Sequence, residues 1–470
     1  MTDTASDISS DISSDIALAW TALGGDPALL SRVTTVERPG ALPSRLPVRQ
    51  LARACVGACA LAAAELAARR AGLAEVPAVR IDDGAVAAAF HSERQLLVDG
   101  RAPVAFAPLS RFWRTADGWV RTHANYPHHR ARLLGALGLP GDASAQDAAA
   151  RLAERPALEV EEAVYGAGGL AVALRTPKEW AATEQAAEVA ARPLVERAHL
   201  DATHARVFTP LGPGTAPLLP AAGLRVLDLT RVLAGPVATR TLALLGADVL
   251  RLDAPWLPEL PDQHADTGFG KRSATLDLGT GRDAFEELLA SADVVVTGYR
   301  PGTLDRFGLS PKALIARRPG LVVAQVSAWG AYGPWGARRG FDSLVQVATG
   351  IATTEGSAEE PGALPAQALD HGTGYLLAAA VLRSLTEQSY DGGGRSVRLA
   401  LARTARWLTD GIRPARATGA PYGGPDAWLT ETDGPLGRLR HARPPVAFAG
   451  GPAGWAAPPV PWGSEPARWR

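Results

Sequence analysis

The middle of the chain carries short apolar runs separated by turn residues and one longer apolar segment. The run 224–229 is short and rich in branched residues, which is typical of a buried strand. A turn at 230–235 leads to Pro236, a residue that is tolerated at the start of a helix. The apolar segment that follows stops at Gly246, which suits a left-handed helix end. A second apolar run, 247–252, comes next. This pattern predicts a strand, a helix and a second strand parallel to the first.

The turn 230–235 follows the carboxyl end of the first predicted strand, where open α/β sheets bind their ligands. It has no G-x-G-x-x-G pattern, so an ordinary dinucleotide site is not indicated. The fold class that we predict is α/β, with a Rossmann-like domain over 222–410 and a smaller α/β domain over 96–209.

The remaining parts of the chain differ in composition. Residues 1–16 are a polar repeat that we expect to be disordered. The segment 210–221 is rich in proline and glycine, which is typical of a linker. The C-terminal arm, residues 411–470, is rich in proline, glycine and tryptophan. In the smaller domain, Phe112–Val120 predicts a hairpin with its turn at Asp117 and Gly118.

An internal comparison suggests a repeat. The pairs Leu46-Pro47 and Val79-Arg80 have the same spacing as Leu364-Pro365 and Val397-Arg398, and each interval encloses an alanine-rich segment. We interpret residues 17–95 as a degenerate half-copy of the catalytic segment. The alternative is that two alanine-rich helices look alike by chance. In this alignment Ala52 stands where the second copy has Asp370.

Composition excludes several functions. The chain has 48 basic and 48 acidic residues, so nothing favours nucleic acid or an anionic membrane as a partner. Neither a signal peptide nor a long uncharged apolar span is evident, which predicts a soluble cytoplasmic protein. Cys55 and Cys59 have no further metal-binding residues near them in the sequence, so we interpret them as core residues. The spacing of His123, His128 and His129 fits no zinc-binding pattern. We therefore expect no metal.

Ordered motifs between residues 231 and 374 resemble CoA-transferase family III, also called the CaiB/BaiF family. The motifs are R-x-x-A-G-P at 231–236, G-A-D-V at 246–249, G-K-R-S at 270–273, R-P-G-T-L-D-R-F-G-L at 300–309, G-F-D at 340–342 with Gln346 and Gly350, and Asp370 with Gly374. In the family the smaller domain follows the catalytic half, whereas here it precedes it, so the halves are in permuted order.

The resemblance implies a nucleophile. Asp370 matches the family's acyl-accepting aspartate, which forms a mixed anhydride and then an aspartyl-CoA thioester. From the residues alone, the favoured interpretation of Asp370 is a helix N-cap ahead of a helix over 375–385, and the resemblance reverses that preference. Gly372 and Gly374 would allow close approach of the thioester and offer N–H groups to an oxyanion, although turn geometry explains them too.

The resemblance also implies the ligands. We expect an acyl-CoA and a carboxylic acid as substrates, with no permanently bound cofactor. The residues carried over for the binding of coenzyme A are Val232, Leu233, Ala234, Tyr299, Arg306 and Arg339. Arginine suits phosphate because it forms paired hydrogen bonds.

Two alternatives stay open. Related acyl-CoA racemases carry histidine where this chain has Phe341, which exchanges no proton, so racemisation is disfavoured. A non-catalytic acyl-CoA-binding paralogue is the other alternative. We also expect a homodimer, because the half-copy 17–95 offers a surface that mimics a partner's.

Overall fold

The computed structural model describes residues 12–212, 214 and 216–470. Seven strands of this part form one sheet, in the order β10-β9-β8-β11-β12-β13-β7. All neighbours are parallel except β7, which pairs antiparallel with β13. The strands are β7 (Glu196–His199), β8 (Arg225–Leu229), β9 (Asp248–Asp253), β10 (Lys271–Thr275), β11 (Val294–Thr297), β12 (Val322–Ser327) and β13 (Arg395–Ala400). The six parallel strands have the doubly wound order of a Rossmann-like domain, which confirms the predicted fold class.

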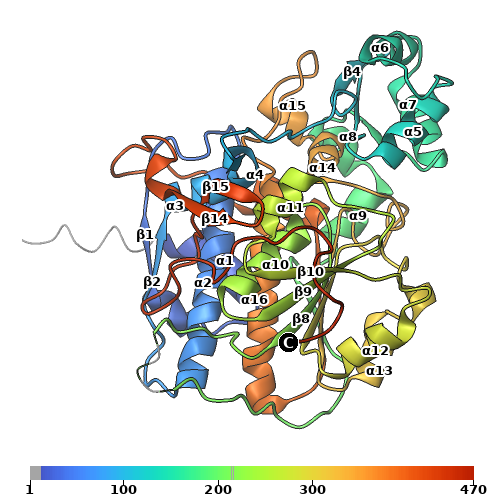
Figure 1. Ribbon diagram of the computed structural model, residues 1–470. Coiled ribbons are helices and arrows are strands. Elements are labelled where there is room, and N and C mark those ends of the chain that lie inside the picture. The colour runs from blue at the N-terminus through green and yellow to red at the C-terminus, as the bar shows by residue number, and fades with distance from the viewer. Residues whose placement is uncertain (1–11, 213, 215) are drawn as a thin grey trace, which may run out of the picture.

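Side chains of each parallel strand alternate between two cores, as the two-residue strand period requires. Val226 and Val294 face helices α10 (Ala234–Leu244) and α16 (Ala368–Asp391). Leu227 and Val295 face the opposite core, with apolar residues of α12 (Arg282–Ala290) and α13 (Pro311–Arg317). Both faces of the sheet are therefore covered by helices (Figure 1).

The predicted strand, helix and parallel strand are confirmed as β8, α10 and β9, which pair in parallel. Helix α10 begins two residues before Pro236. Gly246 has a φ of +99°, so it provides the left-handed turn that the sequence predicted after this helix.

The N-terminal region packs on the outer side of α16. It contains α1 (Ile12–Ala22), η1 (Pro27–Arg32), β1 (Val33–Val36), α2 (Val48–Ala71), β2 (Val79–Asp82), α3 (Asp83–Phe90) and α4 (Ser92–Gln95). The order α2-β2-α3 repeats that of α16, β13 and α17 (Leu401–Arg406), and α2 lies against α16 within one chain (Figure 1). The predicted disordered stretch was too long, because residues 12–16 are helical; residues 1–11 lie outside the described part.

Helix α2 is long and apolar enough to cross a membrane by length and composition, although it is not an uncharged span, since it carries Arg53 and Glu65. Its most apolar window is 94% buried inside the protein, as in the core helix of a globular fold. Cys55 and Cys59 are unpaired and buried in this helix, which confirms them as core residues.

The smaller domain projects from the body (Figure 1). Its strands β4 (Phe112–Arg114), β5 (Trp119–Thr122) and β6 (Ala171–Ala173) form an antiparallel sheet, and the first two are the predicted hairpin. Its helices are α5 (Pro127–Ala136), α6 (Ala145–Ala153) and α7 (Ala157–Gly166), which share a separate core with the sheet. Helices α8 (Pro177–Ala181) and α9 (Glu184–Ala190) return the chain to the body. The predicted linker 210–221 includes residues 213 and 215, outside the described part.

The C-terminal arm begins with a hairpin, β14 (Leu429–Gly434) and β15 (Gly437–Ala442), beside β3 (Leu97–Val98). It then runs across the body, where Trp462 donates a hydrogen bond to Asp253 and Trp469 to the Leu288 carbonyl. The other elements are α11 (Pro261–Thr267), α14 (Asp342–Ala348), α15 (Ile351–Glu355), η2 (Asp305–Phe307), η3 (Trp407–Gly411) and η4 (Asp426–Trp428).

Candidate active site

A cavity of about 250 Å³ opens at the carboxyl ends of β8, β11 and β12. The strand order reverses between β8 and β11, and ligands of doubly wound sheets bind at such a switch point. The wall opposite the strand ends comes from the smaller domain, through Tyr126, His128 and His129. One chain therefore supplies both sides of the cavity.

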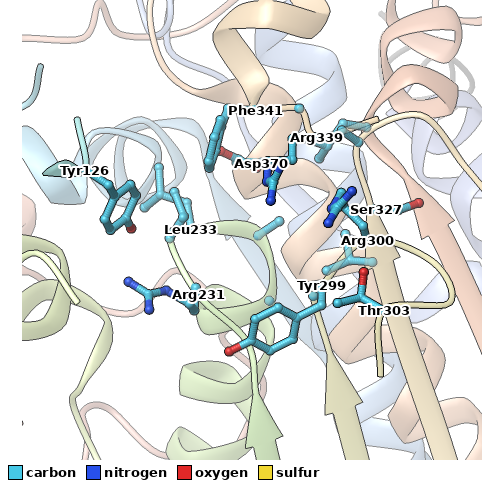
Figure 2. A pocket seen from close by; sticks show the side chains of 18 of the residues that line it. Tyr126, Arg231, Leu233, Tyr299, Arg300, Thr303, Ser327, Arg339, Phe341 and Asp370 are labelled. Atoms are coloured by element: carbon cyan, nitrogen blue, oxygen red, sulfur yellow. The ribbon is translucent and has the colours of Figure 1, made fainter. Parts of the chain in front are cut away.

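Most of the residues selected from the sequence lie in this cavity. Its lining includes Val232, Leu233, Ala234, Tyr299, Arg339, Phe341 and Asp370. Figure 2 shows Asp370 and Phe341 at one end of the view and Tyr299 with Thr303 at the other. Arg306 lies elsewhere: its side chain is exposed and its guanidinium stacks over the ring of Phe307, 4.6 Å from the ring centre.

Asp370 lies in the first turn of α16, because the helix begins at Ala368 and not near Tyr375 as the sequence suggested. Asp370 is therefore not the N-cap. The buried carboxylate of Asp342 takes that role from α14, with one oxygen accepting the backbone N–H groups of Leu369 at 2.8 Å and Asp370 at 2.9 Å. This contact satisfies donors that a helix start leaves free.

The surroundings of Asp370 disfavour its charged form. Burial raises its pKa well above the ordinary value, and the nearby carboxylates of Asp342 and Glu93 raise it further. Burial also raises the pKa of Asp342. A desolvated carboxylate in a cavity is the arrangement expected of a reactive nucleophile, since water no longer stabilises its charge.

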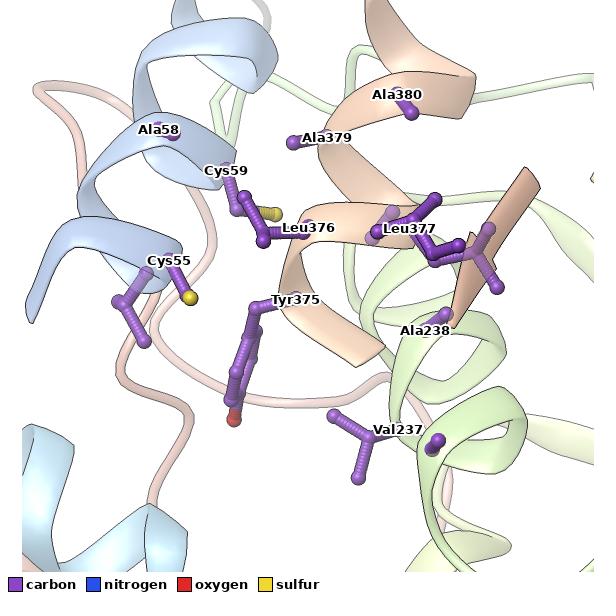
Figure 3. Close-up of a cluster of buried hydrophobic side chains, with 14 of the residues drawn as sticks. Cys55, Ala58, Cys59, Val237, Ala238, Tyr375, Leu376, Leu377, Ala379 and Ala380 are labelled. Carbon is purple, nitrogen blue, oxygen red and sulfur yellow. The ribbon is translucent and has the colours of Figure 1, made fainter. Parts of the chain in front are cut away.

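Gly372 and Gly374 do not face the cavity as the sequence suggested; they let α16 pack closely on both sides. A Cβ on Gly374 would lie 2.5 Å from the Ala234 carbonyl oxygen of α10, and one on Gly372 would lie 3.3 Å from Cys55 Sγ of α2. Figure 3 shows α16 between α2 and α10. The close approach at Gly374 brings the N-terminus of α10 beside the start of α16.

The loop before α10 is strained and held in place. Val232 has a φ of +69°, which is rare for a β-branched residue and is found mainly where surrounding contacts enforce it. The buried carboxylate of Glu259 accepts the N–H of Val232 at 3.0 Å and also hydrogen bonds from the Tyr126 hydroxyl and Arg231. Sequence reasoning did not select Glu259 or Tyr126, and Arg231 entered only as the first residue of the R-x-x-A-G-P motif, since no local pattern links the three positions.

Positive charge gathers at one wall of the cavity. Arg300 and Arg339 line this wall. Arg339 and Arg132 of α5 both donate a hydrogen bond to the carbonyl oxygen of Gly168. Burial lowers the pKa of Arg339, and the neighbouring Arg300 and Arg132 lower it further. Such a concentration of cations suits a bound anion such as phosphate. Arg300 directly follows Tyr299 in the sequence, but the sequence analysis did not select it.

The histidines beside the cavity are poor bases. His123 stacks on Phe341 with ring centres 3.9 Å apart, and burial lowers its pKa to about 3. Burial and the neighbouring His128 lower the pKa of His129 to about 2. Within the described residues, no group of three or more metal-binding side chains suits a metal ion.

Residues 221–423 match the model of CoA-transferase family III. The chain is 34% identical over 207 residues to acetyl-coenzyme A transferase nodX of Hypoxylon pulicicidum, covering 42% of this chain and 35% of that protein. It is 36% identical over 208 residues to the probable fatty acyl-CoA transferase Rv3272 of Mycobacterium tuberculosis, covering 40% of this chain and 52% of that one. The matches thus span about half, or less, of these relatives. A solved CAIB/BAIF family protein from Brucella suis is 27% identical with a TM-score of 0.36, covering 47% of this chain and 65% of that chain.

Proposed function

Because residues 221–423 match the model of CoA-transferase family III, we propose that this chain belongs to the family and transfers coenzyme A from an acyl-CoA thioester to a free carboxylic acid. One observation carries the proposal: the desolvated carboxylate of Asp370 opens into the same cavity as Arg300 and Arg339. A nucleophile and a cationic wall in one cavity match the two parts of the substrate, a reactive thioester and an anionic nucleotide.

The first half of the reaction exchanges one acyl bond for another at Asp370. A carboxylate oxygen of Asp370 attacks the thioester carbon, the carbon–sulfur bond breaks, and a mixed anhydride and CoA thiolate result. The thiolate then attacks the Asp370 carboxyl carbon, which releases the donor acid and leaves an aspartyl-CoA thioester. The acceptor carboxylate repeats both steps in reverse order, so the new acyl-CoA leaves and Asp370 is free. No net proton is taken up or released.

The N-terminus of α10 is placed to stabilise the negative charge that develops during attack by Asp370. Ala234 and Gly235 line the cavity at the start of this helix, where N–H groups lack partners within the helix and the helix dipole is positive. An oxyanion formed during attack by Asp370 would be stabilised by donors at this position.

The test is to trap the acylated aspartate. The full chain is incubated with an acyl-CoA and hydroxylamine, and CoA exchange into a labelled acid is followed in parallel. We expect a hydroxamate at residue 370 by mass spectrometry, and loss of exchange by at least about a thousandfold in Asp370→Ala with CoA binding retained. Asp142→Ala, at an exposed position of the smaller domain, is the control and should keep wild-type activity. Undiminished exchange by Asp370→Ala would contradict the proposal.

A further inference from the structure

A second chamber adjoins the cavity and shares Val232, Leu233, Phe341 and Asp370 with it. Its other walls come from the N-terminal region, the segment 103–106 that enters the smaller domain, α11 and α14. The second chamber has a volume of about 40 Å³, against about 250 Å³ for the main cavity. Because one water-sized group needs about 10–15 Å³, it admits roughly three such groups.

Residues with unsatisfied polar side-chain atoms line the second chamber. Four such atoms, Glu93 Oε1, His123 Nδ1, Gln263 Oε1 and Ser343 Oγ, are buried and make no hydrogen bond to any described residue. The Glu93 and Ser343 side chains belong to residues that are 9% and 6% exposed. A buried polar atom left without a partner costs about 1–3 kcal/mol, so such atoms mark positions where a ligand completes the bonding. Two of the four atoms, those of Glu93 and Gln263, only accept, so a donor from the ligand would satisfy them.

The Glu93 carboxylate is fixed by its second oxygen. Oε2 lies 3.0 Å from His371 Nε2, and the buried His371 ring stacks on Phe90 with ring centres 5.2 Å apart. Burial acts to raise the pKa of Glu93, but the hydrogen bond and charge of His371 outweigh it and hold the pKa below its ordinary value. Glu93 is therefore a carboxylate held toward its charged form, and its residue lines the chamber together with Asp370.

We propose that the second chamber holds the acyl group and selects a short acyl chain that bears a hydrogen-bond donor, a hydroxyl or an amino group, opposite Glu93. The inference rests on the proposed function and names its substrate class. With the thioester carbon at Asp370 and the CoA moiety in the main cavity, the acyl substituents extend into the second chamber. Long unbranched acyl chains exceed its volume.

The same carboxylate rejects acyl groups that carry a second negative charge. A dicarboxylic acyl group would place its free carboxylate beside Glu93 and Asp370, where like charges repel. Arg94 is the neighbouring cation, with Nε 3.7 Å from Glu93 Oε1. Replacing Glu93 by a neutral residue removes the repulsion and releases Arg94 from its ion pair with Glu93. Such a variant should therefore accept dicarboxylic acyl groups.

The experiment compares four-carbon acyl-CoAs of matched size. Butyryl-CoA, 2-hydroxybutyryl-CoA, 3-hydroxybutyryl-CoA, 3-aminobutyryl-CoA and succinyl-CoA are given to the full chain, with palmitoyl-CoA as the long substrate. We expect kcat/KM for at least one hydroxyl- or amino-bearing substrate to exceed that for butyryl-CoA by about tenfold or more. Glu93→Gln keeps an amide acceptor but loses the charge, so this preference should fall several-fold, and succinyl-CoA turnover should rise relative to that of butyryl-CoA. Ser343→Ala provides a second variant that leaves His371 undisturbed.

Glu154→Gln, at an exposed glutamate of the smaller domain, is the matched control and should keep the wild-type preference. Equal turnover of butyryl-CoA and all the donor-bearing substrates, or a preference unchanged in both Glu93→Gln and Ser343→Ala, would overturn the inference while the transferase proposal stands. Faster turnover of palmitoyl-CoA would overturn it as well. A chain that exchanges CoA with none of the thioesters would overturn both proposals together.

Discussion

The carboxylate of Asp342 accepts a hydrogen bond from the backbone N–H of Asp370 at 2.9 Å. Asp342 of the G-F-D motif and Asp370, the proposed nucleophile, lie 28 residues apart in the chain, and this bond joins them. The same motif continues through Gln346, which donates to Asp342 and accepts the N–H of Leu364 at 2.9 Å. The motif thus fixes the segment that leads into α16 and the first turn that carries Asp370.

Asp342 is therefore a positioning residue. Asp342→Ala leaves two buried N–H groups without an acceptor, so we expect a loss of about 2–3 kcal/mol in the free energy of unfolding. The kcat should fall at least tenfold while the affinity for free CoA changes little. Asp342→Asn keeps an acceptor and should recover most of both quantities. Denaturant unfolding and steady-state kinetics measure the two effects, and a purely structural role predicts a stability loss without a selective loss of kcat.

The raised pKa of Asp370 makes both activity and stability depend on pH. Attack requires the carboxylate, so the acid limb of the kcat/KM profile should lie above the ordinary aspartate pKa of 3.8. Glu93→Gln removes one of the charges that raise the pKa and should move the limb to lower pH. An acid limb at or below the ordinary value in the wild type would contradict this prediction.

The stability effect has the opposite sign to that of a salt-bridged carboxylate. The folded chain binds the Asp370 proton more tightly than the unfolded chain does, so the free energy of unfolding falls as pH rises from 3.8 through the raised pKa. Asp370→Asn removes this loss. We expect the variant to be about 1 kcal/mol more stable than the wild type at pH 7, with the difference vanishing below about pH 4. Thermal melts across pH measure it, and a variant less stable at pH 7 would contradict the argument.

The two glycines of α16 should differ in their tolerance of a methyl group. In Gly374→Ala the new Cβ meets a backbone oxygen of α10 at 2.5 Å, whereas in Gly372→Ala it meets the Cys55 side chain at 3.3 Å. We expect Gly374→Ala to cost about 1–3 kcal/mol and to lower activity, because α10 must move. Gly372→Ala should have the smaller effect on both. The reverse order in chemical denaturation would contradict the packing role.

Phe341 separates transfer from racemisation. Racemisation needs proton-exchanging groups on both faces of the α-carbon, and the residue that faces Asp370 across the cavity end is apolar. Burial lowers the pKa of the adjacent His123 to about 3, which disfavours its protonated form. A chiral 2-methylacyl-CoA in deuterated buffer should therefore keep its configuration and its α-hydrogen. Deuterium uptake that Asp370→Ala abolishes would support a racemase instead.

The half-copy changes the expected assembly. The homodimer expectation rested on a surface of residues 17–95 that mimics a partner's, yet α2 packs against α16 in the same chain. We now expect a monomer at micromolar concentration by light scattering, with full activity on dilution. A concentration-dependent mass accompanied by loss of activity on dilution would show that a second copy is needed.

The sequence by itself determined the local elements. The alanine-rich segment of the first repeat interval is helix α2, and Pro47 and Gly72 in the sequence stand at its two ends. The β8-α10-β9 unit followed from apolar runs, Pro236 and Gly246, since side-chain periodicity and end residues act within a few positions. Motif order also selected Asp370 and the loop 232–234 as parts of one site.

Only the tertiary structure decided which side chains meet. No local sequence pattern indicates that Glu93 and the histidines of the smaller domain line the same cavities as Asp370. The sequence likewise does not indicate that Gly372 and Gly374 face other helices, or that Arg306 faces solvent. Apolar burial brings these segments together, and it is non-directional and depends on the summed surfaces of many elements. A residue's neighbours across hundreds of positions are thus set by the packing of whole helices and sheets, while its own helix or strand is set by the residues beside it.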